Sequence, residues 1–438
     1  MQIHKKRRPA LVAAVQRAFA TIYVDHAIYI DDDTLGGFDD AEREVSADEL
    51  KALKNCVGER PLHAFASGFL SERLEGREFA KDDRETLTDA LGDSSFSALA
   101  EEMVAALESL PFEYLCSFAL SDQIDASLDD GGPWGIAPNI SVAKGDAFDL
   151  AHPNYSADRP DQDRFLLQIA RLLDEHLPKA GTAHLTVHVK GHLQRYAAYA
   201  PTQEAADQAI RTFFGLALVF NVVSYSPAFG QQTEVRVHVH RPRSGPAEPF
   251  IQFRLSTSTS RVLRGLRFVE QIKEPGHRAW PKTPQMVWVQ WVLSHDKGER
   301  LHRAARWFFD SFGSDSVLMQ YLQAMICMEI LLGDAQTKDG DISVGALIRN
   351  RCAYLIGKDV DEREEISANI KRIYATRSAI VHNGLSEMSS DDRKLLATLR
   401  WYCARVIEME ASRLGAVASL RASPDLNSVG KGVPSGHD

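Results

Sequence analysis

The sequence predicts an α+β protein: an N-terminal helical segment, a middle domain with an antiparallel sheet, and an all-α helical bundle. Both ends of the chain carry apolar side chains at helical spacing, whereas several segments between them alternate apolar and polar residues, as strands do. A chain of 438 residues is also too long for one compact core. We therefore expect an acidic helical region at 1–110, an α/β domain at 111–295, a helical domain at 296–413 and a disordered tail at 414–438.

The N-terminal region has helical spacing over Ala41–Val57, Arg60–Leu74 and Ser94–Leu110. A basic run at residues 5–8 precedes six apolar residues and imitates a signal peptide, but Gln16 interrupts the apolar run too early. We interpret it as a solvated helix start. No stretch approaches 18 apolar residues, which predicts that the chain has no membrane-spanning segment. Five cysteines without a C-x-x-C pair indicate reduced thiols, and hence a cytoplasmic protein.

The middle region changes to strand-like alternation. We expect one helix, Thr202–Val222, and five strands: Phe112–Leu120, His184–Arg195, Glu234–Arg241, Phe250–Leu255 and Gln285–Leu293. His184, His188 and His192 share one face of their strand, and His238 and His240 share one face of another. Paired strands could bring these imidazoles to a metal, but no Cys, Asp or Glu ligand stands at close spacing. We favour a solvated sheet face and no metal.

Residues 231–283 are locally basic within a chain of net charge -10. A protein this acidic would have to hold a polyanion by a local patch. The candidates for binding a polyanion or another ligand are Arg236, Arg241, Arg254 and Arg261. Their basic neighbours are Arg243, Arg264, Arg267, Lys273, Arg278 and Lys282. The alternative, that these charges only solvate the strands, stays open.

Beyond the middle region the pattern is helical throughout. It predicts five helices: Glu299–Phe312, Asp315–Gly333, Ser343–Ile356, Asp361–Asn383 and Ser389–Arg413. Asp315 and Asp361 are candidate N-caps. Asn383-Gly384 is a helix stop, because glycine tolerates the left-handed conformation needed there.

Two charges interrupt the apolar stripes of this region. Arg377 falls at the centre of a stripe formed by Ile370, Ile373, Tyr374, Ile380 and Val381, all within about 60° of it. Glu329 falls in the stripe of Leu318, Leu322 and Met325. A buried guanidinium and a buried carboxylate are both costly unless they are paired. We therefore expect Glu329 and Arg377 to meet, or to line one polar cavity.

His382 follows Arg377 by five residues, about 140° round the helix. It lies in the last turn, where unpaired carbonyls favour a cation, and is suited to proton transfer near neutral pH. An arginine that holds a phosphate and a histidine that moves a proton can cleave RNA through its own 2′-hydroxyl, with no metal. No Walker A string, G-x-G-x-x-G string or nucleophile elbow offers another chemistry.

The segment from Tyr374 to Gly384, YATRSAIVHNG, resembles the R-x4-6-H signature of HEPN domains. It is most similar to the Apea-like branch, which occurs in prokaryotic anti-phage effectors. Tyr321–Gly333 resembles the Glu-bearing second helix of that branch, and Leu347–Ile356 resembles its third. The resemblance covers Glu299 to Arg413 and leaves the first two-thirds of the chain unexplained.

The resemblance implies a homodimer in which two Arg–His sets face one cleft and cut RNA without metal or cofactor. The products would end in a 2′,3′-cyclic phosphate. Arg377 would position the scissile phosphate, His382 would act as general base or acid, and Glu329 would orient Arg377. Tyr374, Ser378 and Asn383 would support the site. Ser378 departs from the family pattern, since many members have Asn, Asp or His directly after the arginine.

The resulting hypothesis is a cytoplasmic anti-phage endoribonuclease whose region 1–295 senses a trigger and restrains the helical domain. A different class of function stays open: a HEPN module that binds RNA or a partner protein and cuts nothing. The pattern is also compatible with a purely structural pair of Arg377 and Glu329, with His382 at a helix end.

Overall fold

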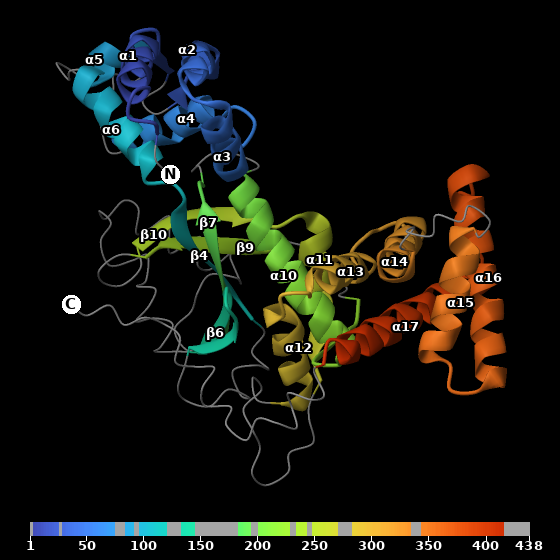
Figure 1. Cartoon of the computed structure of the whole chain (residues 1–438). Coiled ribbons are helices and arrows are strands. Elements are labelled where there is room, and N and C mark those ends of the chain that lie inside the picture. Colours follow the sequence, from blue (N-terminus) through green and yellow to red (C-terminus); the bar gives the residue numbers. More distant parts are fainter. Residues whose placement is uncertain are drawn as a thin grey trace. The chain divides into compact units, whose positions relative to one another are not determined.

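The helices and strands gather into two units, each assembled from separate parts of the sequence. Unit 1 comprises Met1–Cys116, His188–Ala206 and His238–Phe253, and unit 2 comprises Ser117–Val187, Asp207–Val237 and Arg254–Asp438. The computed structural model shown in Figure 1 describes residues 3–25, 29–74, 84–91, 96–120, 133–144, 183–193, 200–227, 234–242, 248–269, 283–333 and 343–415. The predicted tail at 414–438 lies outside these residues from 416 onward. The predicted four-part division of the chain stays a prediction.

Unit 1 begins with a bundle of helices around an apolar core. The helices are α1 (Arg8–Phe19), α2 (Gly36–Ala41), α3 (Ala47–Val57), α4 (Pro61–Leu74), α5 (Leu87–Leu91) and α6 (Phe96–Glu108), with 3-10 turns at Asp32–Leu35 and Glu42–Glu44. A capping box formed by Ser46 and Glu49 starts α3. A small sheet, in the order β2 (Tyr29–Ile30), β1 (Tyr23–Asp25), β3 (Glu85–Thr86), lies beside the helices. The three predicted N-terminal helices are confirmed, with shorter bounds.

A six-stranded antiparallel sheet confirms the predicted α+β class. Its order is β10 (Glu248–Arg254), β9 (Arg236–Arg241), β4 (Phe112–Ala119), β7 (Ala183–Gly191), β6 (Ile140–Lys144), β5 (Trp134–Ala137). The predicted helix of the middle region is α10 (Pro201–Val219). A two-stranded sheet of β8 (Val223–Tyr225) and β11 (Leu266–Phe268) and the helix α11 (Thr257–Gly265) complete this part. Four of the five predicted strands are therefore present.

The fifth predicted strand, Gln285–Leu293, is wrong: these residues form the helix α12 (Pro284–Ser294). Thr283 caps this helix by accepting the backbone N–H of Met286, and Pro284 occupies the first turn, where its missing N–H costs nothing. The buried side chains are Met286, Val289 and Val292, which stand three residues apart. Helical spacing had been hidden by the β-branched and aromatic residues between them.

The prediction of a solvated sheet face is wrong for four of the five histidines. His184, His192, His238 and His240 are all buried, and only His188 is exposed. On β7 the Thr186 hydroxyl is also buried, 2.9 Å from the Ser117 hydroxyl of β4. Both faces of β9 are therefore covered at these residues, whereas His188 and Lys190 of β7 are exposed. No group of three or more metal-ligating side chains occurs within the described residues.

The burial of His192 predicts that the stability of unit 1 depends on pH. Its ring lies 4.8 Å from that of Phe65 and is 5% exposed, and burial together with the nearby Arg241 charge lowers its pKa to about 4. An unfolded histidine titrates near about 6.5. We expect the contribution of His192 to the unfolding free energy to be fully present above about pH 6.5. It should fall by about 3 kcal/mol as the pH drops to about 4, because only the unfolded chain binds the proton readily in this range. Urea unfolding of unit 1 across this range checks it; an equally steep pH dependence in His192→Leu contradicts it.

The C-terminal end of the chain forms five helices in unit 2, as predicted: α13 (Glu299–Asp310), α14 (Val317–Leu332), α15 (Val344–Ile356), α16 (Val360–His382) and α17 (Ser390–Arg413). Two expected caps are displaced. Ser316 rather than Asp315 caps α14, and Asp359 rather than Asp361 caps α16. In each case the capping residue has extended backbone and its side-chain oxygen accepts a backbone N–H of the first turn.

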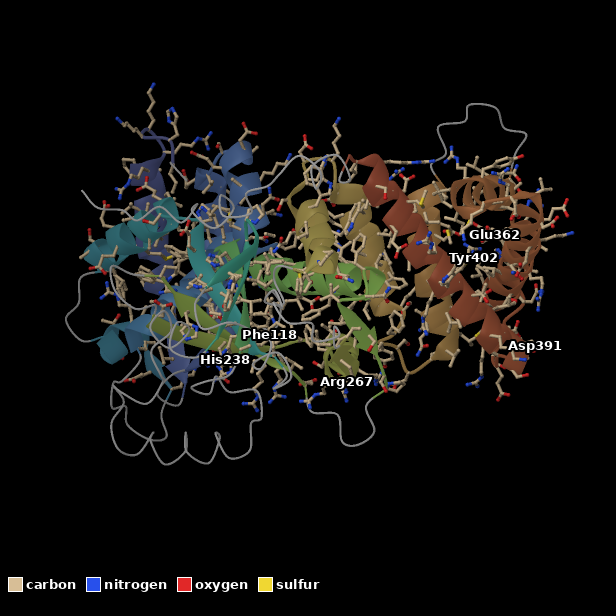
Figure 2. The ribbon with its side chains drawn as sticks, turned by 90° about the horizontal axis from the view of Figure 1, so that it is seen from below. Phe118, His238, Arg267, Glu362, Asp391 and Tyr402 are labelled. Carbon is tan, nitrogen blue, oxygen red and sulfur yellow. The ribbon has the colours of Figure 1, made fainter. Side chains whose placement is uncertain are left out.

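Within this bundle α15 and α16 lie side by side and α17 packs against α13, α14, α15 and α16 (Figure 1). Asn369 of α16 donates its side-chain N–H to the hydroxyl of Tyr402 of α17 over 3.1 Å, and Figure 2 shows Tyr402 beside Glu362 of α16. All five cysteines are free, and Cys116, Cys327, Cys352 and Cys403 are buried. No helix of the described residues combines the length and the apolar character that crossing a bilayer requires.

Candidate functional site

Arg377 stands on α16 where an apolar residue would complete the buried stripe. Ile366, Ile370 and Ile373 are the buried residues of this helix, at spacings of four and three. Arg377 comes four residues further along, on the same face. Its side chain is 32% exposed, so the guanidinium lies at the border between core and solvent. The predicted position within the stripe is therefore correct, but the burial is partial.

Glu329 meets Arg377 from the neighbouring helix α14. Arg377 Nε lies 3.8 Å from Glu329 Oε1, and the carboxylate is 31% exposed. Glu329 continues the line of Leu318, Leu322 and Met325 on α14, of which the two leucines are half-buried and Met325 is buried. The two opposite charges that the sequence placed in neighbouring stripes thus form an ion pair. A pair exposed to this degree stabilises a fold by about 0–1 kcal/mol, so stability alone is a weak reason for its presence.

The guanidinium of Arg377 remains available to a ligand. The separation of 3.8 Å from Glu329 is an ion pair but is too long for a hydrogen bond. Within the part of the chain that the structure describes, Arg377 makes no hydrogen bond. A guanidinium has five N–H donors in a planar fork that matches phosphate geometry. Glu329 therefore orients the side chain while leaving its donors open.

Tyr374 lies one turn before Arg377 and closes the inner side of the site. Its hydroxyl is buried and lies beside the Glu329 carboxylate. Burial raises the pKa of Tyr374, and the nearby Glu329 carboxylate raises it further. The phenol is therefore a neutral donor beside an anion. Glu329 therefore interacts with both Tyr374 and Arg377.

Close packing of α15 on α16 fixes the Tyr374 ring. Gly345 of α15 faces the ring so closely that a Cβ added there would lie 3.1 Å from Tyr374 Cδ1. A glycine is the residue that permits this approach. We expect Gly345→Ala to displace the ring and to cost about 1–3 kcal/mol of unfolding free energy by overpacking. Urea unfolding measures this, and a variant as stable as the parent would show that the ring is free to move.

Two hydrogen bonds hold the segment of α16 that carries Tyr374 and Arg377. The hydroxyl of Tyr321 of α14 donates to the carbonyl of Ile373 over 3.0 Å, and Thr376 donates to the Asp392 carboxylate of α17 over 3.0 Å. Asp392 also accepts from Ser389 at the start of α17, and these bonds lower the pKa of its carboxyl. The arginine is thus carried on a segment tied to both flanking helices. Tyr321, Thr376 and Asp392 are not among the predicted site residues, because their roles depend on which helices pack together.

His382 is the last residue of α16 and is exposed. Gly384 follows with φ of +64°, and Leu385 donates its backbone N–H to the carbonyl of Ala379, which closes the predicted helix stop. Among the described residues His382 makes no hydrogen bond or ion pair with Arg377 or Glu329. The supporting candidates Ser378 and Asn383 are also exposed. One copy of the chain therefore brings together Glu329, Tyr374 and Arg377, but not His382.

The basic candidates of the middle region are dispersed. Arg241 lies in unit 1, paired with Glu72 over 3.0 Å and placed over the rings of Phe112 and Tyr114. Arg254 pairs with Glu234 in unit 2 over 3.2 Å, and Arg261 is 14% exposed and pairs with Asp315 over 2.6 Å.

Arg236 is half-buried on β9. Four basic neighbours predicted for the same patch, Arg243, Lys273, Arg278 and Lys282, lie outside the described residues. The contacts made by the other arginines favour the alternative interpretation, in which their charges solvate the strands and form ion pairs within the fold.

Comparison of the chain with protein-family models, with curated proteins and with solved structures finds no match.

Proposed function

We propose that the chain is a metal-independent endoribonuclease of the HEPN type. The observation that carries the proposal is the pairing of Arg377 with Glu329 on adjacent helices, with the arginine's donors open and the buried Tyr374 hydroxyl beside the same carboxylate. A partly exposed ion pair adds little to stability, so stability alone does not explain this pair. The open N–H donors of Arg377 can bind an anion.

The reaction follows from the chemistry of the three side chains. RNA brings its own nucleophile, the 2′-hydroxyl next to the scissile phosphate. His382 removes the proton as the 2′-oxygen forms its bond to phosphorus. The bond from phosphorus to the 5′-oxygen then breaks, and that oxygen takes a proton from solvent water as it leaves. Arg377 stabilises the negative charge that builds up on the phosphoryl oxygens. The products end in a 2′,3′-cyclic phosphate and a 5′-hydroxyl.

A second copy of the chain completes the site in this proposal. His382 and Arg377 belong to one helix but share no hydrogen bond or ion pair, so in this proposal the imidazole acts on a phosphate that lies between two copies of the chain. The homodimer forms through the helical domain.

The biological setting is part of the same proposal. An enzyme of this class in the cytoplasm has to be restrained, because it would cut the cell's own RNA. Region 1–295 senses a trigger, such as a phage-derived molecule, and restrains the helical domain until then. The protein is an anti-phage effector in this account, with RNA as its substrate and no metal or cofactor.

The test is cleavage of RNA in the presence of EDTA, followed by analysis of the ends. We expect cleavage to persist at the rate seen without EDTA and to leave 2′,3′-cyclic phosphate and 5′-hydroxyl ends. Loss of cleavage in EDTA, or 5′-phosphate ends, would overturn the proposal.

A binding module is the second candidate, and the separation of His382 from Arg377 within one chain favours it. Such a module would hold RNA or a partner protein on Arg377 and cut nothing. The two functions differ in one measurement: a binding module shows saturable RNA binding that weakens in Arg377→Ala, with no cyclic-phosphate ends at any protein concentration.

A further inference from the structure

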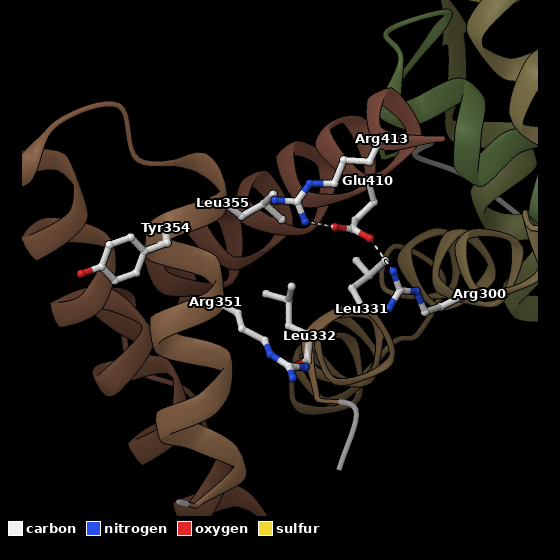
Figure 3. Close-up of a pocket in the computed structure, with 8 residues that line it drawn as sticks. All are labelled: Arg300, Leu331, Leu332, Arg351, Tyr354, Leu355, Glu410 and Arg413. Carbon is white, nitrogen blue, oxygen red and sulfur yellow. Dashed lines mark hydrogen bonds and ion pairs between the residues drawn. The ribbon is translucent and has the colours of Figure 1, made fainter. Parts of the chain in front are cut away.

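A polar cavity lies in the helical bundle, between α13, α14, α15 and α17 (Figure 3). Its volume is about 460 Å³, which is within the range of small-molecule sites. The lining residues are Arg300, Leu331, Leu332, Arg351, Tyr354, Leu355, Glu410 and Arg413. None of them belongs to the site of Glu329, Tyr374 and Arg377. The cavity is therefore a separate feature of unit 2.

The cavity lining has an excess of positive charge. Glu410 is the only carboxylate among the lining residues, and it is 11% exposed between two guanidinium groups. It pairs with Arg300 and, over 2.8 Å, with Arg413. Arg351 has no carboxylate partner among the described residues and donates from Nη1 to the carbonyl of Leu332 over 2.8 Å. The lining thus carries three guanidinium groups and one carboxylate, and the carboxylate pairs with only two of them.

The nearby helix ends explain part of this arrangement, but they do not use all the N–H donors of the arginines. α14 ends at Leu332 and α17 ends at Arg413, and the free carbonyls of a helix end attract cations. The bond from Arg351 to Leu332 serves that purpose with one of five N–H donors. Figure 3 shows Arg351 and Arg413 on opposite sides of Leu331, Leu332 and Leu355. The side chain of Tyr354 points away from the cavity in the same view, and it is 73% exposed.

We propose that this cavity binds an organic phosphate of the size of a mononucleotide. Arginine forks are the side chains that recognise phosphate by paired hydrogen bonds, and Arg351 and Arg413 supply two of them. The three leucines between them provide an apolar surface for the rest of the ligand. An inorganic phosphate would leave that surface and most of the volume unused. The proposal is independent of the endoribonuclease function.

The test is titration of the full-length chain with AMP, adenosine and inorganic phosphate by calorimetry. We expect AMP to bind at least about tenfold more tightly than adenosine or phosphate alone. Arg351→Gln/Arg413→Gln is expected to weaken AMP binding by at least about tenfold, because each removes charge-assisted hydrogen bonds. Arg393→Gln, an exposed arginine of α17 outside the cavity, is the matched control and should bind AMP as the parent does.

Arg351 caps α14, so a second variant guards against loss of folding. Arg413 is 63% exposed, and Arg413→Glu reverses one charge without touching the core. AMP binding is expected to fall in Arg413→Glu and to be retained in Arg377→Ala. Three results would overturn the proposal: no AMP binding at about 1 mM, AMP binding in both cavity variants as tight as in the parent, or loss of AMP binding in Arg377→Ala alone.

A nucleotide can reach the cavity free or as the end of an RNA strand. The same titration with a 5′-phosphorylated trinucleotide of 2′-deoxy chemistry, which cannot be cleaved through a 2′-hydroxyl, distinguishes the two. Tighter binding of the trinucleotide than of AMP, weakened in Arg413→Glu, supports a strand end as the ligand. Tighter binding of AMP, weakened in the same variant, supports a free nucleotide. Binding of both that is unchanged in Arg413→Glu contradicts the proposal.

Discussion

Arg377→Ala and His382→Ala are each expected to lower the rate of RNA cleavage by at least about a hundredfold. Removing one group that stabilises charge in the transition state, or one that transfers a proton, has effects of this order. Folding should survive, because Arg377 is only partly buried and its pair with Glu329 is worth little to stability. Initial cleavage rates in EDTA, together with urea unfolding of each variant, measure both expectations.

The matched control is Arg372→Ala, which removes an exposed arginine from the same helix. It should cleave within a few-fold of the parent. Glu329→Gln keeps the shape of the side chain but removes its charge, and we expect an intermediate rate because Arg377 loses its orienting partner. A rate for Arg377→Ala that matches the Arg372→Ala control contradicts the proposed role.

Tyr321→Ala is expected to lower the unfolding free energy by about 3–5 kcal/mol. The ring is fully buried between α14 and α16, and its hydroxyl donates to the carbonyl of Ile373. Removing it leaves a cavity and an unpaired carbonyl under the segment that carries Tyr374 and Arg377. Urea unfolding of unit 2 gives the value.

Tyr321→Phe separates the two contributions, since it keeps the ring and deletes only the hydroxyl. Its expected cost is about 1 kcal/mol, the net worth of one hydrogen bond. The difference between the two variants is the contribution of ring packing. If Tyr321→Ala costs no more than Tyr321→Phe, the contact between α14 and α16 is not what positions the arginine.

The meeting of Glu329 and Arg377 could be predicted from sequence for an electrostatic reason. Each charge interrupts an apolar stripe, and opposite charges in two stripes that face the same core reduce each other's desolvation cost. Helix periodicity located both positions, and the structure places the two side chains 3.8 Å apart. The prediction needed no knowledge of tertiary contacts beyond the packing of two neighbouring helices.

Helix α12 shows where local patterns fail. The segment Val287-Trp288-Val289-Gln290-Trp291-Val292 is rich in residues that favour strands. The cap at Thr283 and the proline after it decide the outcome, and a helix signal of that kind was available in the sequence. The same limit applies to His184 on β7, since alternation along a strand cannot tell whether its polar face is covered.

Features that join distant segments were beyond the sequence analysis. Gly345 approaches Tyr374 across two helices, and the Arg351 cavity needs side chains from four helices. Spacing along one helix says which residues share a face, but not which face of another helix they meet. The sequence therefore contains no pattern from which this cavity could be predicted.

The central claim is that Arg377 and His382 act on a phosphodiester that RNA attacks with its own 2′-hydroxyl. Its most direct test compares two RNA strands in EDTA that differ only by a 2′-deoxy sugar at the nucleotide preceding the cleaved bond. We predict that the all-ribose strand is cut and the substituted strand is left intact at that position. Cleavage of both strands at the same bond would contradict the account, because the nucleophile would then be something other than the substrate's own hydroxyl.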